Sequence, residues 1–375
     1  MKKKNLIVFG TRPEAIKMAP LVKEFLKYQD VFETKVCVTA QHREMLDQVL
    51  SFFEIIPDFD LDLMKPNQNL YSLTADIITG LKPVLEEFKP DFVYVHGDTT
   101  TTMATSIASF YSGAKICHIE AGLRTFNMQL PFPEEMNRCA TSIIANYHFS
   151  PTIVSKENLL KENKSERDII VTGNTVIDAL LFSVNKIKNG YVDLEINELK
   201  EKIDINKKII LVTGHRRENH GQGFIDICKG LKEIALQNNK DVEIVYPVHL
   251  NPNVQIPVYE LLSNIKNVKL IAPLSYPAFI WLMEKSYLII TDSGGVQEEA
   301  PSLGKPVLVM RDATERPEAV LAGTVSIVGT NKEKIVKETN KLLNDDLAYQ
   351  AMSLLHNPYG DGNSCSRVVN YVKSL

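Results

Sequence analysis

Short apolar segments alternate with longer amphipathic segments along the whole chain, and few folds accommodate this alternation. In the first amphipathic segment, apolar residues recur at Ile16, Ala19, Val22 and Phe25, which is the spacing of one helix face. Repeated strand–helix units of this kind predict parallel sheets covered by helices on both faces. In the first half of the chain, the predicted strands are residues 6–9, 34–39, 92–96 and 116–119, and the predicted helices are residues 15–28, 43–53, 73–88, 101–111 and 134–146.

The same alternation begins again after about residue 170. Here the predicted helices are residues 193–204, 224–238 and 259–264, and the predicted strands are residues 209–213, 242–247, 268–271, 287–291 and 307–310. At 375 residues the chain is too long for one ordinary core. We therefore predict an α/β fold of two doubly wound Rossmann-like domains, residues 1–170 and 171–363, that face each other across a cleft.

The composition favours a soluble globular protein and argues against several kinds of partner and structural site. Hydrophobic residues make up 44% of the chain and charged residues 23%, as in soluble globular proteins. The net charge of −4 gives no reason to expect a nucleic-acid or membrane partner. The five cysteines include no C-x-x-C pair, which argues against a disulfide framework and a structural zinc. No segment is long and apolar enough for a membrane span or a signal peptide, so we expect a cytoplasmic protein.

A Ser-Gly-Gly turn follows the predicted strand 287–291 and opens a helix. Glycines let backbone N–H groups approach a ligand closely, and a helix N-terminus favours an anion, so Ser293, Gly294 and Gly295 predict a diphosphate site. Glu299 lies about one turn further on, where its carboxylate would reach the two hydroxyls of a ribose. The alternative is that this strand–helix joint is only a structural feature of a parallel sheet.

Three acids follow strands or open a helix in the first half of the chain. Asp98 and Glu120 come after the strands 92–96 and 116–119, and Glu134 opens a helix after two prolines. The structural alternatives are a helix cap for Asp98 and a favourable helix-dipole interaction for Glu134. Three such acids in one domain, with a diphosphate site in the other, favour proton-transfer chemistry.

Cationic and aromatic residues complete the candidate site. Arg12 and Lys17 lie near the start of the first helix and would pair with phosphate, or would simply be solvated. His215 follows the strand 209–213 and would bind phosphate or transfer a proton, and Arg316 is another arginine close to the glycines. Phe279 offers apolar surface to a base or packs in the core. The G-x-G-x-x-G fingerprint is missing from the strand–helix joints, which disfavours a nicotinamide site.

Taken in order, these motifs closely resemble those of the bacterial non-hydrolysing UDP-N-acetylglucosamine 2-epimerases. The matching segments are residues 10–14, 96–98, 120–124, 131–138, 215–219, 293–301, 315–318 and 357–362, and the resemblance covers essentially the whole chain. It implies a GT-B fold, a homodimer, and interconversion of UDP-GlcNAc and UDP-ManNAc for surface polysaccharides. It also implies that a last helix, residues 364–375, returns to the first domain.

The resemblance also implies a mechanism. The C2 hydrogen of the sugar is not acidic, so inversion needs either transient oxidation or elimination of UDP to enzyme-bound 2-acetamidoglucal and its re-addition. By position, the resemblance assigns proton handling to Asp98, Glu120 and Glu134, a place by the phosphates to His215, the diphosphate to Arg12, Ser293, Gly294 and Gly295, the ribose to Glu299, the uracil to Phe279, and supporting charge to Lys17 and Arg316. No metal and no redox cofactor are implied.

Some relatives bind a second UDP-GlcNAc as an activator. Gln41, His42 and Gln68 match that pocket, although Asn67 stands where those relatives carry an arginine. The resemblance therefore implies allosteric activation. Three alternatives remain open: a hydrolysing relative that releases ManNAc and UDP, a GT-B glycosyltransferase with a sugar acceptor, and a non-catalytic sensor of sugar nucleotides.

Overall fold

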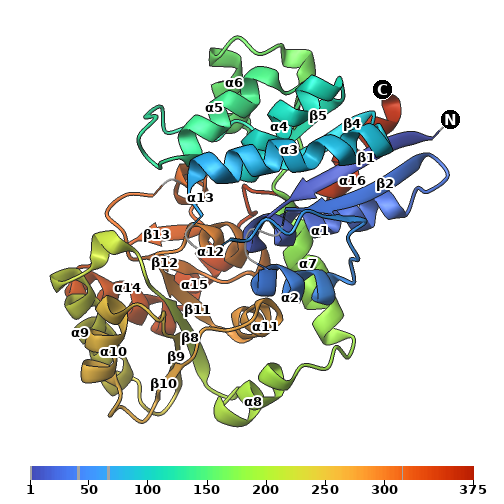
Figure 1. The fold of residues 1–375 in the computed structure, drawn as a ribbon. Coiled ribbons are helices and arrows are strands. Elements are labelled where there is room, and N and C mark those ends of the chain that lie inside the picture. The colour runs from blue at the N-terminus through green and yellow to red at the C-terminus, as the bar shows by residue number, and fades with distance from the viewer. Residues whose placement is uncertain (1, 40–42, 66–67, 315) are drawn as a thin grey trace. The chain divides into compact units, whose positions relative to one another are not determined.

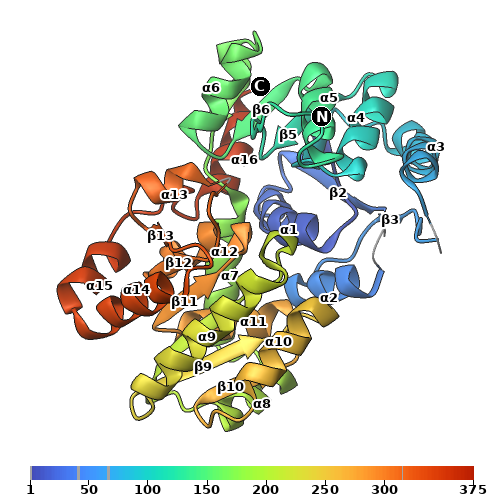
Figure 2. The same cartoon turned by 90° about the vertical axis from the view of Figure 1, so that its left-hand side faces the viewer.

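The structure is a computed structural model that describes residues 2–39, 43–65, 68–314 and 316–375. It divides into two compact units (Figures 1 and 2). The first unit comprises Met1–Leu181 and Tyr359–Leu375, and the second comprises Phe182–Pro358. The sequence-based prediction had placed this division near residue 170 and kept the last helix with the first unit.

The first unit is built on a seven-stranded parallel sheet of order β3-β2-β1-β4-β5-β6-β7. Its strands are β1 Lys3–Phe9, β2 Phe32–Val38, β3 Phe59–Asp60, β4 Phe92–His96, β5 Lys115–Ile119, β6 Tyr147–Ser150 and β7 Ile169–Val171. Its helices are α1 Arg12–Leu26, α2 Arg43–Phe53, α3 Leu70–Phe88, α4 Thr100–Ser112, α5 Glu134–Ile144, α6 Ile153–Lys161, the start of α7 Thr175–Lys188, and α16 Ser364–Ser374, with a 3-10 turn η1 at Glu166–Asp168. The strand order reverses between β1 and β4, which is where sheets of this kind bind ligands.

The C-terminal helix α16 packs against α1 beside the N-terminal strand (Figure 1). The Nζ atom of Lys3, the first residue of β1, donates hydrogen bonds to the carbonyls of Val372 and Lys373 at 2.9 and 3.1 Å. Val368, Val369 and Val372 are buried, so this helix contributes an apolar face. The last helix of the chain therefore belongs to the first unit.

The second unit contains a six-stranded parallel sheet of order β10-β9-β8-β11-β12-β13. Its strands are β8 Lys208–Thr213, β9 Val242–Pro247, β10 Val268–Ile271, β11 Leu288–Thr291, β12 Val307–Val309 and β13 Val325–Ile327. Its helices are α8 Leu194–Lys202, α9 Gln222–Gln237, α10 Pro252–Leu262, α11 Tyr276–Lys285, α12 Gly294–Glu299, α13 Pro317–Leu321, α14 Lys332–Asn344 and α15 Asp346–Ser353, with 3-10 turns η2 Arg217–Asn219 and η3 Ala300–Leu303. The strand order reverses between β8 and β11.

Helices α9, α10 and α14 pack side by side on this sheet (Figure 2). Apolar residues on these helices form one buried cluster with alternate residues of the strands, such as Ile210 and Val212 of β8. The sequence prediction of a helix at residues 259–264 was wrong at its start. The helix α10 begins at Pro252 because Asn251 caps it by accepting from the N–H of Asn253, and Pro252 occupies the first helical position.

Among the helices in the described ranges, none combines the length and hydrophobicity that a membrane span requires.

Candidate active site

The buried carboxylate of Glu14 connects the start of α1 to the start of α4, which follows the neighbouring strand β4. Thr11 caps α1, and Glu14 accepts hydrogen bonds from the N–H groups of Gly10 and Thr11 at 3.1 and 2.9 Å. The hydroxyl of Thr99, which caps α4, also donates to Glu14 at 2.6 Å. The β1–α1 loop, which leads to Arg12, is thereby fixed against the β4–α4 loop, which carries Asp98.

Asp98 is held by an ion pair and does not cap α4, so the structural alternative considered for this residue is wrong. Arg138 of α5 donates to its carboxylate at 2.6 Å, and the side chain of Asn137 donates to its backbone carbonyl at 2.8 Å. Arg138 is buried and also pairs with Glu135 at 3.0 Å. The cap is Thr99, which accepts from the N–H of Thr102. The Asp98 carboxylate is therefore oriented by a neighbouring helix.

Glu120 follows β5 in a left-handed backbone conformation, with φ of 60° and only 9% of its surface exposed. This conformation costs a non-glycine residue about 1 kcal/mol or more. Backbone strain of this kind is common at functional sites. Lys17 contacts its carboxylate at 2.5 Å, Asn174 donates to it at 2.9 Å, and His96 Nε2 lies 3.6 Å away. Burial raises the pKa of Glu120, but Lys17 and His96 outweigh burial and hold that pKa well below its ordinary value.

The third acid differs from the other two. Glu134 opens α5 directly after Pro133, and its Oε2 atom is buried without a hydrogen-bond partner in the part of the chain that the structure describes. Arg12 is the first residue of α1, and Lys17 lies further along the same helix, where it faces Glu120. The cations and acids of the first unit thus gather at the carboxyl edge of its sheet, on both sides of the reversal between β1 and β4.

In the second unit, Ser293 is the N-cap residue of α12, but its side chain makes no capping hydrogen bond. A Cβ atom at Gly294 would come within 4 Å of the guanidinium groups of Arg216 and Arg316, and one at Gly295 within 4 Å of the Glu299 carboxylate. The two glycines therefore leave space beside two guanidinium groups and one carboxylate. Arg316 is itself held by a hydrogen bond from its Nε atom to Glu298. This arrangement suits an anion with a hydroxyl-bearing group next to it.

His215 lies next to this turn because β8 and β11 pair with Thr213 opposite Thr291. Its side chain is partly exposed, its Nδ1 atom is 3.5 Å from the Oδ1 atom of Asp292, and its ring stacks on His249. Burial lowers the pKa of His215, Asp292 raises it, and His249 and Arg216 lower it further, so that the pKa falls below its ordinary value. An imidazole in this setting is suited to binding phosphate or moving a proton near neutral pH.

Phe279 lies on α11 and is partly buried, whereas its neighbours Ile280 and Trp281 are buried. Gln41, His42 and Asn67 lie outside the described residues. Gln68 donates to the carbonyl of Leu63 at 2.8 Å and lines a groove of about 1150 Å³ in the first unit.

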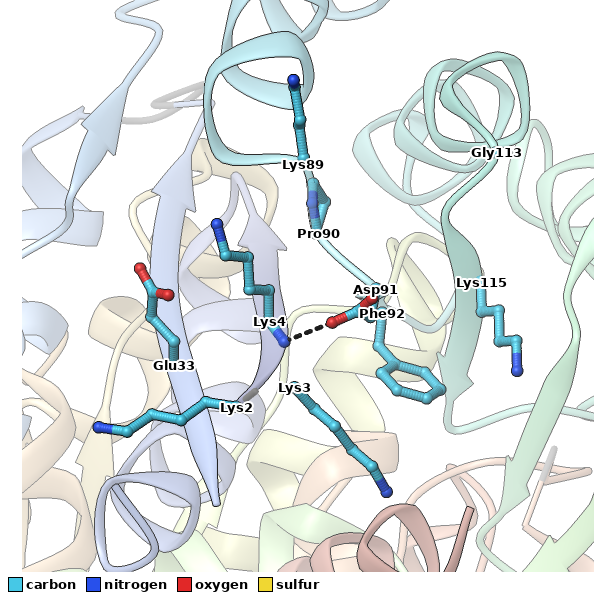
Figure 3. Close-up of a pocket in the computed structure, with 10 residues that line it drawn as sticks. All are labelled: Lys2, Lys3, Lys4, Glu33, Lys89, Pro90, Asp91, Phe92, Gly113 and Lys115. Carbon is cyan, nitrogen blue, oxygen red and sulfur yellow. Dashed lines mark hydrogen bonds between the residues drawn. The ribbon is translucent and has the colours of Figure 1, made fainter. Parts of the chain in front are cut away.

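A second cavity of the first unit, about 820 Å³, lies at the amino ends of β1, β4 and β5, whereas the acids lie at the carboxyl ends of the strands (Figure 3). It is lined by Lys2, Lys3, Lys4, Lys89, Lys115, Glu33, Asp91, Pro90, Phe92 and Gly113. Two of its five lysines bond helix C-termini: Lys4 Nζ donates to the carbonyl of Phe88 at the end of α3, and Lys3 donates to carbonyls of α16. Since cations at helix C-termini are stabilising by themselves, these two lysines need no ligand to explain their positions.

Sequence reasoning missed five residues that organise these clusters: Glu14, His96, Arg138, Asn174 and Asp292. Two of them carried a local signal: Thr11-x-x-Glu14 is a capping box, and Asp292 directly follows a buried strand. Among the described residues, no group of three or more His, Cys, Asp and Glu side chains is placed to hold a metal ion.

Comparison with known proteins shows the family of the whole chain. The family model for UDP-N-acetylglucosamine 2-epimerase matches residues 24–373. The UDP-N-acetylglucosamine 2-epimerase of Campylobacter jejuni is 59% identical over 375 residues, covering 99% of this chain and 97% of that protein. The enzyme of the same name from Escherichia coli K12 is 59% identical over 374 residues, covering 99% and 98%. A crystal structure of the Neisseria meningitidis UDP-GlcNAc 2-epimerase bound to UDP-GlcNAc superposes with a TM-score of 0.89 at 52% identity, covering 99% of this chain and 100% of that one.

Proposed function

Because the chain belongs to the UDP-N-acetylglucosamine 2-epimerase family, we propose that it interconverts UDP-GlcNAc and UDP-ManNAc by eliminating UDP and adding it back through enzyme-bound 2-acetamidoglucal. Its two Rossmann-like sheets have the GT-B-like fold of the solved epimerase structures. Crystal structures of relatives contain UDP-GlcNAc, or UDP-GlcNAc together with UDP, and these ligands motivate the proposed substrate and leaving group.

The observation that carries the proposal is the different environment of each acid in the first unit. Glu120 is paired with Lys17, Asp98 is paired with Arg138, and Glu134 has a buried oxygen with no partner in the described structure. Inversion at C2 requires removal of a proton from one face of the sugar and delivery to the other. Three acids in different environments supply the separate proton-handling groups that such a reaction needs.

The second unit supplies groups suited to the leaving nucleotide. We assign the diphosphate to Ser293, Gly294 and Gly295 with Arg12 of the first unit, the ribose to Glu299, and the uracil to Phe279. His215 and Arg316 add donors that stabilise the negative charge on departing UDP. Lys17 keeps Glu120 ionised, so that this carboxylate is ready to accept a proton. Neither a redox cofactor nor a metal takes part in this route.

We further propose that the enzyme works as a homodimer, that it supplies precursors of surface polysaccharides, and that UDP-GlcNAc activates it through the groove lined by Gln68. A sigmoidal dependence of the initial rate on UDP-GlcNAc concentration, abolished in Gln68→Ala, is the expected result for activation. Sedimentation of the purified protein at a mass of twice 42.2 kDa is the expected result for the dimer.

Proton NMR of the reaction mixture tests the proposed activity. Starting from UDP-GlcNAc, we expect signals of UDP-ManNAc to grow to a constant ratio, and the same ratio to be reached from UDP-ManNAc. Steady accumulation of free ManNAc and UDP would instead identify a hydrolysing enzyme. Full turnover in the triple variant Asp98→Asn, Glu120→Gln, Glu134→Gln would overturn the assignment of the acids.

A further inference from the structure

Asp292, the residue that follows β11, is fully buried directly behind His215. Its Oδ2 atom accepts hydrogen bonds from the N–H groups of His215 and Arg216 at 2.9 and 2.8 Å. The side chain of Asn219 donates to the same oxygen at 3.3 Å. One oxygen of this carboxylate therefore fixes the backbone of the loop that follows β8.

The other oxygen, Oδ1, is buried and has no hydrogen-bond partner in the described part of the chain. The Nδ1 atom of His215 lies 3.5 Å from it, slightly beyond a good hydrogen bond. A buried acceptor without a donor costs about 1–3 kcal/mol, so a small rotation of the imidazole that brings an Nδ1–H group to Oδ1 is favoured. The unsatisfied oxygen thus defines which edge of the ring faces inward.

The face of the same ring is covered by His249, which follows β9. The two ring centroids are 5.3 Å apart and the planes are inclined by 17°. The Nδ1 atom of His249 accepts from the N–H of Asn251 at 3.1 Å, so this atom carries no proton. His215 is therefore constrained at one edge by a carboxylate and on one face by an aromatic ring.

We infer that Asp292 is a positioning residue for His215: it accepts the Nδ1–H of the imidazole and turns Nε2 toward the bound diphosphate. His249 assists by holding the plane of the ring. The role of this arrangement in turnover rests on the proposed function, in which His215 faces UDP. The orientation of the ring relative to Asp292 is independent of the proposed function.

The inferred arrangement gives the imidazole two useful states. In the neutral ring, the proton is on Nδ1 and the Nε2 lone pair is free to accept a proton. In the protonated ring, Nε2–H donates to the diphosphate while Asp292 balances the charge, which would stabilise departing UDP. The charged and titratable groups around His215 are Asp292, His249 and Arg216, and their opposing effects keep its pKa below the ordinary value.

The tautomer of His215 can be measured directly in the full-length protein. Long-range proton–nitrogen NMR of protein labelled with ¹⁵N-histidine, at a pH well above the pKa of the ring, distinguishes Nδ1–H from Nε2–H. Comparison with His215→Gln assigns the signal. We expect the Nδ1–H form in the wild-type protein. In Asp292→Asn, the amide would donate to Nδ1, and we expect the Nε2–H form instead.

The matched control is His249→Phe, which keeps an aromatic ring on the face of His215 and leaves Asp292 in place. We expect this variant to retain the Nδ1–H form. We also expect kcat for Asp292→Asn to fall by roughly 10²-fold or more, since its Nε2 atom already carries a proton in the neutral ring and has no lone pair to accept another.

An Nε2–H form in the wild-type protein would overturn the inference, and this outcome does not depend on whether Asp292→Asn folds. An Nδ1–H form that persists in folded Asp292→Asn would also overturn it, because Asp292 would then only anchor the backbone. The predicted tautomers without any turnover of UDP-GlcNAc would support the positioning role and reject the proposed function. Turnover of UDP-GlcNAc by a protein whose His215 is in the Nε2–H form would support the proposed function and reject the positioning role.

Discussion

The Glu120 carboxylate shows how a buried acid is kept ionised. Burial alone would raise its pKa, but Lys17 at 2.5 Å and His96 at 3.6 Å favour the charged form and lower it. Because the pKa is lower in the folded than in the unfolded state, the stabilising contribution is present above the unfolded pKa. It is lost as pH falls through the folded pKa. Lys17 therefore sets the pH range over which Glu120 can accept a proton.

Replacing Lys17 by methionine removes the nearest positive charge, while burial continues to raise the pKa of Glu120. We expect the acidic limb of the kcat/KM profile to move to higher pH. The measurement is kcat/KM for UDP-GlcNAc across the pH range in which the enzyme is stable.

The control for Lys17 is Lys27→Met. Lys27 pairs with Glu24 at 2.6 Å, but 65% of its side chain is exposed, so its loss should leave the profile in place. An acidic limb that stays at the wild-type position in Lys17→Met would show that Lys17 does not govern the protonation of Glu120.

At the scale of elements, the loops at the carboxyl ends of the first sheet are held together by hydrogen bonds and ion pairs between loops that follow different strands. Glu14 joins the β1–α1 loop to the start of α4, and Arg138 joins α5 to the β4–α4 loop. Each of these interactions connects segments that are distant in sequence and adjacent in the sheet. The acids therefore keep their positions only if these loops are held together.

Replacing Glu14 by glutamine exchanges an acceptor oxygen for an amide that faces several donors. We expect a loss of about 1–3 kcal/mol in the free energy of unfolding, and a fall in kcat because Arg12 and Asp98 are no longer held in register. Denaturant unfolding and steady-state kinetics measure the two effects. The control Glu86→Gln changes a carboxylate that is 66% exposed on α3, where little effect is expected. A wild-type kcat in Glu14→Gln would contradict the claim that Glu14 holds the β1–α1 and β4–α4 loops in register for catalysis.

The paired strands β5 and β6 carry His118 and His148 opposite each other, and both side chains are buried. Burial lowers the pKa of His118 to about 3 and that of His148 to about 4. Between these values and the ordinary pKa of 6.5, the unfolded chain binds more protons than the folded one. Stability should therefore fall as the pH falls below 6.5.

The His148→Gln variant tests this pH dependence. We expect its free energy of unfolding to decrease less between pH 6.5 and 4 than that of the wild-type protein, by about 3 kcal/mol. Urea unfolding at a series of pH values gives the comparison. His356→Gln, at an exposed position, is the control and should follow the wild-type curve. Parallel curves for His148→Gln and the wild-type protein would show that His148 is not the source of the pH dependence.

At the scale of the whole molecule, the strand–helix alternation was sufficient to predict two parallel sheets, because buried parallel strands are short, apolar and regularly followed by helices. The short strands β3, β6, β7 and β13 were missed. Tyr147–Ser150 carries a histidine and a serine, and the other three are only two or three residues long. The solved epimerase structures confirm the predicted fold class.

The candidate site was only partly accessible from the sequence. Asp98 and Glu120 were found because an acid within two residues of the end of a buried strand is conspicuous. Asp292 carries the same signal, but its partner His215 lies 77 positions away, and Arg138 acts on Asp98, 40 positions away, as the Arg138–Asp98 and Asp292–His215 hydrogen bonds show. Such partners become neighbours only when the order of the strands in the sheet is known. The assignment of roles to the site residues stays a prediction.

The central claim is that C2 of the sugar loses and regains its proton while UDP is detached. The most direct test is turnover of UDP-GlcNAc in deuterated water, followed by proton NMR of the C2 position in both nucleotide sugars. We predict that deuterium enters C2 of UDP-ManNAc and, as the reaction approaches equilibrium, also C2 of UDP-GlcNAc. Complete interconversion with the original hydrogen retained at C2 of both compounds would contradict the account.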